Sequence, residues 1–466
     1  MDSEGATSRV KRSHNVTLWA AVAGVVALVI VAAIVIIKPG ASNSPLTVDP
    51  AGPSYVSRDP VTGVVTGSLG VTHTDGERLR YAITSNTTTP NGGRLSIDEA
   101  AGTFTYTPTQ AARLRTDRGL APGETFVVSV TDGKHDPVSV TVTPPLAPAH
   151  LDLGEKPIAV GMHPIDVAVS PDGARVYILN MGGGGTLSVI DTANNAVVGP
   201  PIALGLRAPS RFAINPQGTR LYITDVETNT LSVIDTANGT PIGDRIPVGK
   251  KPLGVAVSHD GTRVYVSNVD DGTVSVIDTT GNTVIGDPIR VGVAPFGVAV
   301  SPDGTRLYVI ERGLRVNGAY GQGTVSVIDT ATRAVIGPPL RVGAAPEDLA
   351  VSPDGAHVYV VNADEGTMSV IDTATNTVVG KPSPVGSFPA NVAVSPDGSL
   401  AYFTNSGDGT LAVVDTATNE VVASLKVVVT PAPGQGFLYA VALTPNGNRA
   451  YVTNYDTGSV PVISFA

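Results

Sequence analysis

The chain has no cysteine, a single tryptophan and few other aromatic residues. The absence of cysteine excludes disulfides, thiolate catalysis and cysteine-ligated zinc. Basic residues are also in deficit, with 30 Lys and Arg against 40 Asp and Glu, and they form no cluster. Binding to a phosphate backbone depends on clustered Lys and Arg, so we expect no nucleic-acid partner.

Glycine and proline, in contrast, are frequent, with 52 and 37 copies, and they separate short runs of Val, Ile and Thr. This composition is typical of many short strands joined by tight turns. The length of 466 residues exceeds that of one ordinary domain. We therefore expect an all-β protein with more than one domain.

One long apolar run lies near the N-terminus, from Leu18 to Ile37. A helix of that length spans about 30 Å, the thickness of the hydrocarbon core of a bilayer. Basic residues precede it (Arg9, Lys11 and Arg12), whereas only Lys38 follows directly. The positive-inside rule then predicts a cytoplasmic tail at 1–17, a single-pass transmembrane signal anchor at 18–37, and extracytoplasmic domains after it. The alternative is a cleaved signal peptide, which usually has a shorter apolar region and a small-x-small cleavage site.

Residues 38–52 are predicted to be a linker and residues 53–148 a small β-sandwich. Alternating runs such as Gly102–Pro108 and Phe126–Gly133 indicate antiparallel strands. These two strings resemble the cadherin-like VCBS repeats of bacterial surface proteins, which often bind calcium in a loop rich in carboxylates. The corresponding loop here, His73–Glu77, has only two acids, and calcium prefers six to eight oxygen ligands. We interpret it as a solvated turn.

A repeat of about 44 residues begins near residue 160. It starts at a Val-Gly or Leu-Gly pair, at Gly161, Gly205, Gly249, Gly292, Gly343 and Gly386. Each unit contains four β-like runs, and Ser-Pro-Asp-Gly elements supply a tight hairpin turn after the first. This period with four strands a unit is typical of a propeller blade. Counting the first strands predicts a seven-bladed β-propeller over residues 149–466.

The second strand of the repeat ends in a recurring signature. It reads Tyr-Val-Ser-Asn at 265–268, Tyr-Val-Val-Asn at 359–362 and Tyr-Val-Thr-Asn at 451–454. Together with the Ser-Pro-Asp-Gly turns, this pattern resembles the YVTN β-propeller family. The resemblance implies a prokaryotic cell-surface protein, and most members of that family lack a known activity. Related propellers include lactonases and electron-transfer subunits, so the fold alone does not select a function.

The last unit lacks a fourth strand, and a candidate for it lies upstream of the first unit. Lys156–Gly161 has the same pattern as Asp287–Gly292, a fourth strand within the repeat. We therefore predict that residues 155–160 pair with 459–463 and close the ring.

No motif for catalysis, cofactor attachment or metal binding is present, and the seven histidines are scattered. We predict no catalytic residue, no metal and no cofactor. The loops that enter the first strands vary most between units, as does an insertion at Arg312–Gln322 in the fourth unit. In a propeller these loops share one face. The candidate binding residues there are Asp166, Arg211, Phe296, Glu347, Asp348, Asn391 and Tyr439, together with Arg312, Arg315 and Tyr320 of the insertion.

Two functions remain open from the sequence. The favoured one is a membrane-anchored binding module at the bacterial cell surface, with an unknown protein or cell-envelope ligand as its partner. The alternative is an exported, lactonase-like hydrolase with its site at the propeller axis.

Overall fold

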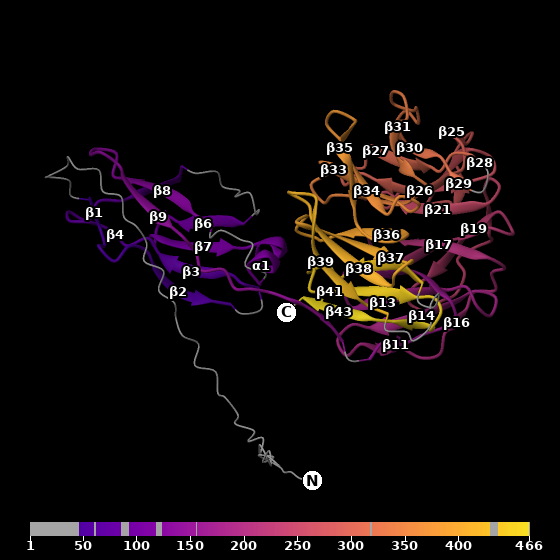
Figure 1. Cartoon of the computed structure of the whole chain (residues 1–466), viewed down its shortest axis with the longest axis horizontal. Helices are drawn as coiled ribbons and strands as arrows, with labels where there is room; N and C mark the ends of the chain where they lie inside the picture. The colour runs from indigo at the N-terminus through magenta and orange to yellow at the C-terminus, as the bar shows by residue number, and fades with distance from the viewer. Residues whose placement is uncertain are drawn as a thin grey trace, which may run out of the picture.

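The computed structural model describes residues 46–465, apart from 60–61, 85–92, 118–123, 155, 317–318 and 429–436 (Figure 1). The predicted transmembrane segment at 18–37 lies outside the described residues. Within the described residues, no helix is long and apolar enough to cross a membrane. These residues form an all-β structure with one helix, α1 (Gln110–Asp117).

Residues 46–142, here called the N-terminal module, form three antiparallel sheets around one core. Their strands are β1 (Leu46–Val48) with β4 (Val71–His73); β2 (Ser54–Arg58), β3 (Val65–Ser68), β7 (Thr103–Thr107) and β6 (Arg94–Asp98); and β5 (Arg80–Ile83), β8 (Phe126–Thr131) and β9 (Val138–Val142). Alternate residues of β8 are buried, as period-two strands with one core face require. Strand β1 lies within the segment that we expected to be a linker.

Residues 151–465, here called the repeat module, form seven successive antiparallel sheets. The sheets are β12 (Pro164–Val169), β13 (Arg175–Asn180), β14 (Thr186–Asp191), β15 (Ala196–Val197) and β16 (Ile202–Ala203); β17 (Pro209–Ile214), β18 (Arg220–Asp225), β19 (Thr230–Asp235) and β20 (Ile246–Pro247); β21 (Pro252–Val257), β22 (Arg263–Asn268), β23 (Thr273–Asp278), β24 (Thr283–Val284) and β25 (Ile289–Arg290); β26 (Pro295–Val300), β27 (Arg306–Glu311), β30 (Gln322–Asp329) and β31 (Leu340–Ala344); β32 (Pro346–Val351), β33 (His357–Asn362), β34 (Thr367–Asp372) and β35 (Thr377–Pro384); β36 (Pro389–Val394), β37 (Leu400–Asn405), β38 (Thr410–Asp415) and β39 (Glu420–Lys426); and β40 (Leu438–Leu443), β41 (Arg449–Asn454), β42 (Ser459–Val460) and β43 (Val462–Phe465) with β10 (Leu151–Leu153) and β11 (Ile158–Ala159). A separate hairpin, β28 (Arg315–Val316) with β29 (Ala319–Tyr320), comes from the insertion.

The first strands of these sheets lie innermost and contact one another in a ring. β12 contacts β17, β17 contacts β21, and the series continues through β40, which contacts β12. This repeated arrangement fits a β-propeller, in agreement with the sequence repeat (Figure 1).

The seam of the ring is closed by the segment before the first sheet, as predicted. Ile158 and Ala159 of β11 pair with Val460 and Ser459 of β42. Strand β10 adds a second pairing that the sequence pattern did not indicate, with Leu151 opposite Phe465 of β43. Two short strands from the start of the module therefore complete the last sheet.

The asparagine of the four-residue signature has a structural role. Asn268 is fully buried, and its side chain accepts the backbone N–H of Gly249 at 3.0 Å and donates to Thr273 and Ser275 at 3.0 Å each. Asn362 makes the equivalent contacts with Gly343, Thr367 and Ser369. The signature residue thus ties the entry loop to the second and third strands, because its buried polar groups must be satisfied.

We expect Gly249→Ala to destabilise the protein by about 2 kcal/mol or more. A Cβ at this position would lie 2.5 Å from Cγ of Asn268, whose side chain is locked by its hydrogen bonds. Gly281→Ala is the matched control, since the nearest atom to its new Cβ is 3.4 Å away. Urea unfolding measures both, and equal unfolding free energies would contradict this role of the Gly–Asn pair.

Arginines at the start of the second strands join neighbouring sheets. Arg220 donates to the carbonyl of Thr279 at 2.8 Å and Arg263 to that of Thr330 at 2.7 Å, in each case in the next sheet. Arg306 and Arg449 make the same contact with Thr373 and Thr192. The last of these crosses the seam between the seventh and first sheets.

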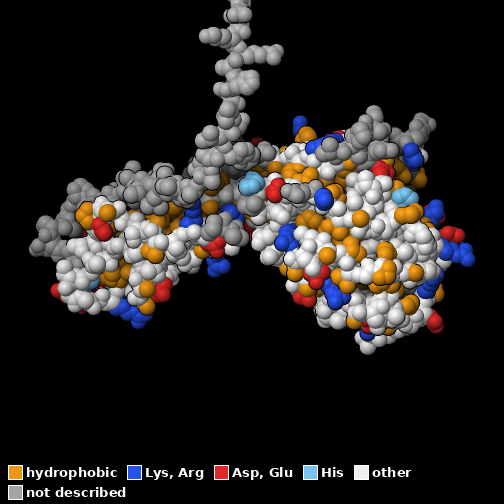
Figure 2. Space-filling model, turned by 90° about the horizontal axis from the view of Figure 1, so that it is seen from below, with side chains coloured by type: hydrophobic (Ala, Val, Ile, Leu, Met, Phe, Trp, Pro, Cys, Tyr) orange, Lys and Arg blue, Asp and Glu red, His pale blue; other side chains and the backbone are white. Residues whose placement is uncertain are grey.

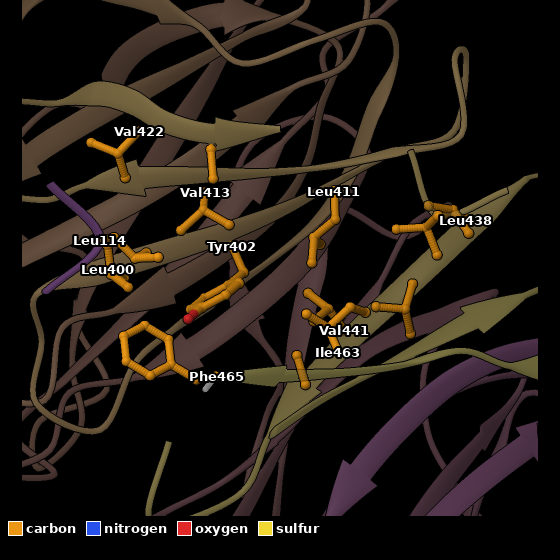
Figure 3. Packing of buried hydrophobic residues seen from close by; sticks show 14 of the residues in the cluster. Leu114, Leu400, Tyr402, Leu411, Val413, Val422, Leu438, Val441, Ile463 and Phe465 are labelled. Carbon is orange, nitrogen blue, oxygen red and sulfur yellow. The ribbon is translucent and has the colours of Figure 1, made fainter. Parts of the chain in front are cut away.

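Two sheets depart from this arginine pattern, and α1 of the N-terminal module docks at the second of them. His357 and Leu400 occupy the arginine positions. Leu114 of α1 packs in one cluster with Leu400 (Figure 3), and Arg115 donates to Asp415 at 2.6 Å and to Thr418 at 2.7 Å. The helix was not predicted, because its short sequence shows no clear apolar stripe. Its docking places the N-terminal module on the side of the Ser-Pro-Asp-Gly turns.

We expect Arg115→Ala to release this docking and to lower the unfolding free energy by about 2 kcal/mol. The ion pair with Asp415 is largely enclosed, with side chains 14% and 2% exposed, so its loss leaves a buried carboxylate without its cation. Arg94→Ala, at an exposed arginine of the same module, is the control. Small-angle scattering should show an extended particle for Arg115→Ala only. A compact particle of unchanged stability would contradict the docking.

Candidate functional site

Two sets of loops lie on the same side of the repeat module, and this side is here called the loop face. In all seven repeats, the residue after the second strand donates its backbone N–H to a carbonyl in the loop that enters the first strand, at 2.9 to 3.1 Å. The pairs are Met181–His163, Val226–Ala208, Val269–Lys251, Arg312–Ala294, Ala363–Ala345, Ser406–Phe388 and Tyr455–Phe437. The Ser-Pro-Asp-Gly turns lie at the opposite ends of these strands and form the turn face.

A cavity of about 120 Å³ opens among the innermost strands. Six of the predicted candidates line it: Asp166, Arg211, Phe296, Glu347, Asp348 and Asn391. Its other lining residues are Phe212, Leu253, Gly254, Val255, Gly297 and Val298. The cavity is thus polar on the side of the first, second, fifth and sixth sheets and apolar on the side of the third and fourth.

Asp166 is buried and bridges two neighbouring sheets. Its carboxylate accepts the backbone N–H of Val167 at 3.0 Å and that of Phe212, in the next sheet, at 2.8 Å. Arg211 lies 3.7 Å from the same carboxylate. Burial nevertheless raises the pKa of Asp166, because the desolvation of the carboxylate outweighs its attraction to Arg211.

Asp348 has the same role on the other side of the cavity. It accepts hydrogen bonds from the Asn391 side chain at 2.5 Å and from the backbone N–H of Val392 at 3.2 Å. Asn391 in turn accepts the backbone N–H of Val441 at 2.9 Å. Desolvation raises the pKa of Asp348 to about 6, and the nearby charge of Asp166 adds to this. The side chains expected to be loop charges therefore also hold the inner ring together.

The insertion contacts two of the cavity-lining residues, Phe296 and Glu347. The guanidinium of Arg312 lies 4.0 Å from the ring centre of Phe296 and forms an ion pair with Glu347. Tyr320 lies on its other side at 5.1 Å, and Arg315 lies 5.6 Å from the ring of Tyr320. Cation–π contacts of this kind order a protruding loop without closing it. All three insertion candidates thus meet at the edge of the cavity.

Tyr439, the remaining candidate, does not line the cavity. Its repeat places Ala440 at the position of Asp166 and Asp348, and Tyr439 at the position of Phe296 and Glu347. The ring of Tyr439 lies 5.3 Å from that of Tyr455, which stacks on His163 at 4.6 Å. His163 and Tyr455 were not among the predicted candidates, since aromatic contact across the seam depends on the ring closure.

Glycines at the cavity were also missed as site residues. A Cβ at Gly254 would lie 2.2 Å from the carbonyl oxygen of Phe296. Glycine therefore allows the third and fourth innermost strands to approach closely. Gly254 and Gly297 occupy the position of Asp166 in their repeats, and this equivalence was the signal that could have identified them.

Exposed apolar side chains gather on the loop face. In the described part of the repeat module, the exposed Phe, Tyr, Met and Leu residues are Met162, Met181, Leu314, Phe388, Phe437 and Tyr439, and all of them lie there. The other exposed large apolar residues are valines, mostly of the outer fourth strands. Concentration of large apolar groups on one face is typical of an interaction surface.

Charge on the surface is mixed. On the face shown in Figure 2, basic and acidic side chains of the described residues are interspersed over both modules. A groove or face that binds nucleic acid would instead gather basic side chains.

Among the described residues there is one group of three His and Asp side chains whose ligating atoms all lie within 4.8 Å of one another. This group lies in the N-terminal module. They are His73, Asp132 and His135. The axial cavity of the repeat module has three carboxylates (Asp166, Glu347 and Asp348), an amide and an arginine instead. An adjacent guanidinium disfavours a metal cation there.

No family model and no curated protein matches this chain. Its structure is similar to a solved chain of Kuenenia stuttgartiensis hydrazine synthase. The TM-score is 0.56 and the sequence identity 23%, over 68% of this chain and 99% of that chain. At this identity the likeness concerns the fold alone.

Proposed function

We propose that this chain is a binding protein of the bacterial cell surface, which recognises a protein or another cell-envelope ligand through its loop face. In this proposal the repeat module is a seven-bladed propeller of the YVTN type. The N-terminal module is a cadherin-like, VCBS-type spacer, and residues 18–37 anchor both modules outside the cell membrane.

The observation that carries this proposal is the distribution of exposed apolar side chains. Aromatic and methionine side chains are enriched in protein interfaces, and here the exposed ones gather on one face of the repeat module. The turn face is in part occupied by α1, whose residue Gln110 donates to the carbonyl of Gly447 at 2.8 Å. The loop face is thus the side of the repeat module that is turned away from this docking.

A thermal-shift and pull-down screen of residues 46–466 against cell-wall polymers and envelope proteins tests the proposal. We expect at least one ligand to bind saturably. An antibody fragment raised against the loop face should compete with that ligand. A ligand that binds equally well when that antibody is present would place recognition elsewhere.

The anchor has its own test. Protease added to intact, wall-stripped cells should remove both modules and leave the segment before residue 46 in the membrane. Modules that resist protease, or that appear in the medium without protease, would contradict the anchor.

A second candidate function is an exported, lactonase-like hydrolase. It is favoured by Asp348, whose raised pKa of about 6 suits a general acid or base in a cavity beside Asp166. In that case Asp348→Asn should abolish hydrolysis of a lactone panel while the protein remains folded. The binding function is preferred because both carboxylates already accept backbone N–H groups of the neighbouring sheets.

A further inference from the structure

The N-terminal module brings together three side chains that are distant in sequence. His73 ends β4, whereas Asp132 and His135 lie in the turn between β8 and β9. Nε2 of His73 lies 3.0 Å from Oδ2 of Asp132, and Nδ1 of His135 lies 2.7 Å from the same oxygen. All three ligating atoms lie within 4.8 Å of one another.

The cluster is built into the module at its base and open at one side. The side chains of His73 and Asp132 are 3% and 0% exposed, whereas that of His135 is 43% exposed. The other carboxylate oxygen of Asp132 accepts the backbone N–H groups of Lys134 and His135 at 2.9 Å each. The carboxylate is thereby held with Oδ2 facing the two imidazoles.

We propose that His73, Asp132 and His135 form a binding site for a divalent transition metal, with Zn²⁺ as the best match. Zinc takes imidazole and carboxylate ligands in a tetrahedral set, with water in a fourth position where the protein supplies three. Zinc bonds of 2.0 to 2.2 Å place tetrahedral ligand atoms about 3.3 Å apart. The observed 2.7 and 3.0 Å separations therefore need to widen by about 0.6 and 0.3 Å.

Calcium fits this set poorly. It requires six to eight oxygen ligands, whereas here one carboxylate oxygen is already engaged by two backbone N–H groups. The site therefore differs from the calcium loops that the sequence resemblance implies. Its metal would link β4 to the β8–β9 turn and so brace the N-terminal module.

Metal binding at Nε2 of His73 requires the other tautomer of that ring. In the metal-free protein Nε2–H donates to Asp132, because Nδ1 is an acceptor; with the metal on Nε2, the ring proton resides on Nδ1. In the metal-free protein Nδ1 accepts the backbone N–H of Asp75 at 3.1 Å. This hydrogen bond must break, and the exposed turn at residues 74–76 allows the amide to face water.

Zinc titration of the full chain, without a histidine tag and stripped with EDTA, tests the site. We expect one Zn²⁺ per chain in competition with a chromophoric chelator, and a rise of the melting temperature with Zn²⁺. His135→Gln keeps a side-chain hydrogen bond to Asp132 within reach, and should weaken Zn²⁺ binding by about 100-fold while preserving the metal-free melting temperature. His259→Ala, at an exposed histidine of the repeat module, should change the affinity by less than about twofold.

Equal Zn²⁺ affinity in His135→Gln and the wild type would overturn the proposal, since binding would then be adventitious. No saturable binding, or Ca²⁺ at equal concentration displacing Zn²⁺, would also overturn it. A shift of the Asp75 amide resonance on addition of Zn²⁺, absent in His135→Gln, would support the proposal directly.

Discussion

A chain that begins at Gly161 should melt at least about 6 °C below one that begins at Ala149. Both lack the N-terminal module, and they differ only in β10 and β11, which close the seam of the ring. Removal of these strands breaks their ladder hydrogen bonds and exposes the apolar partners of Leu151, Leu153 and Ile158. We estimate a loss of about 3 kcal/mol or more.

The closing strands complete the last of seven similar sheets that contact one another in a ring. We therefore expect the loss of stability to extend to the whole repeat module and not only to the last sheet. Scanning calorimetry of the two chains measures it. Equal melting temperatures would contradict the closure of the ring by residues 151–159.

Asp348→Asn should flatten the dependence of stability on pH. The folded pKa of about 6 lies above the ordinary value near 4, so the folded protein binds a proton that the unfolded chain releases between those pH values. The contribution of this group to the unfolding free energy is therefore greatest below about pH 4 and declines as pH rises through about 6. Since the side chain borders the cavity, we expect a decline of about 1 to 2 kcal/mol rather than the full value for complete burial.

Urea unfolding at pH 4 and pH 7 gives this change as the difference between wild type and Asp348→Asn. Asp244→Asn, at an exposed aspartate, is the control and should follow the wild type. A wild type that gains stability relative to Asp348→Asn between pH 4 and pH 7 would show that the carboxylate is stabilised, not strained, in its ionised form.

Much of the repeat module could be predicted because its sequence repeats the same physical solution. Turn, strand and signature residues recur at a fixed spacing, and the match of Lys156–Gly161 to a fourth strand was enough to predict the closing partner. The same reasoning brought six candidates to one cavity. It did not show that Asp166 and Asp348 accept backbone N–H groups of the neighbouring sheets, because those contacts form only when the sheets pack side by side.

The features that escaped prediction depend on contacts between distant segments. Helix α1 is short and has a weak apolar pattern, and it is held by side chains of the repeat module some 300 residues away, such as Asp415. The cluster of His73 with Asp132 and His135 spans 59 residues between its first two members. Its formation depends on the packing of β4 beside the β8–β9 turn, which no local motif records.

The most direct test of the account compares the two faces of the repeat module with one ligand. Phe388→Ser with Tyr439→Ser alters two exposed loop-face aromatics, and His259→Ser alters an exposed residue of a turn-face hairpin. For a ligand identified in the envelope screen, we predict at least about tenfold weaker binding by the loop-face variant, with an unchanged melting temperature. The turn-face variant should bind as the wild type does. Unchanged affinity in the loop-face variant, with a loss in the turn-face variant, would contradict the assignment of recognition to the loop face.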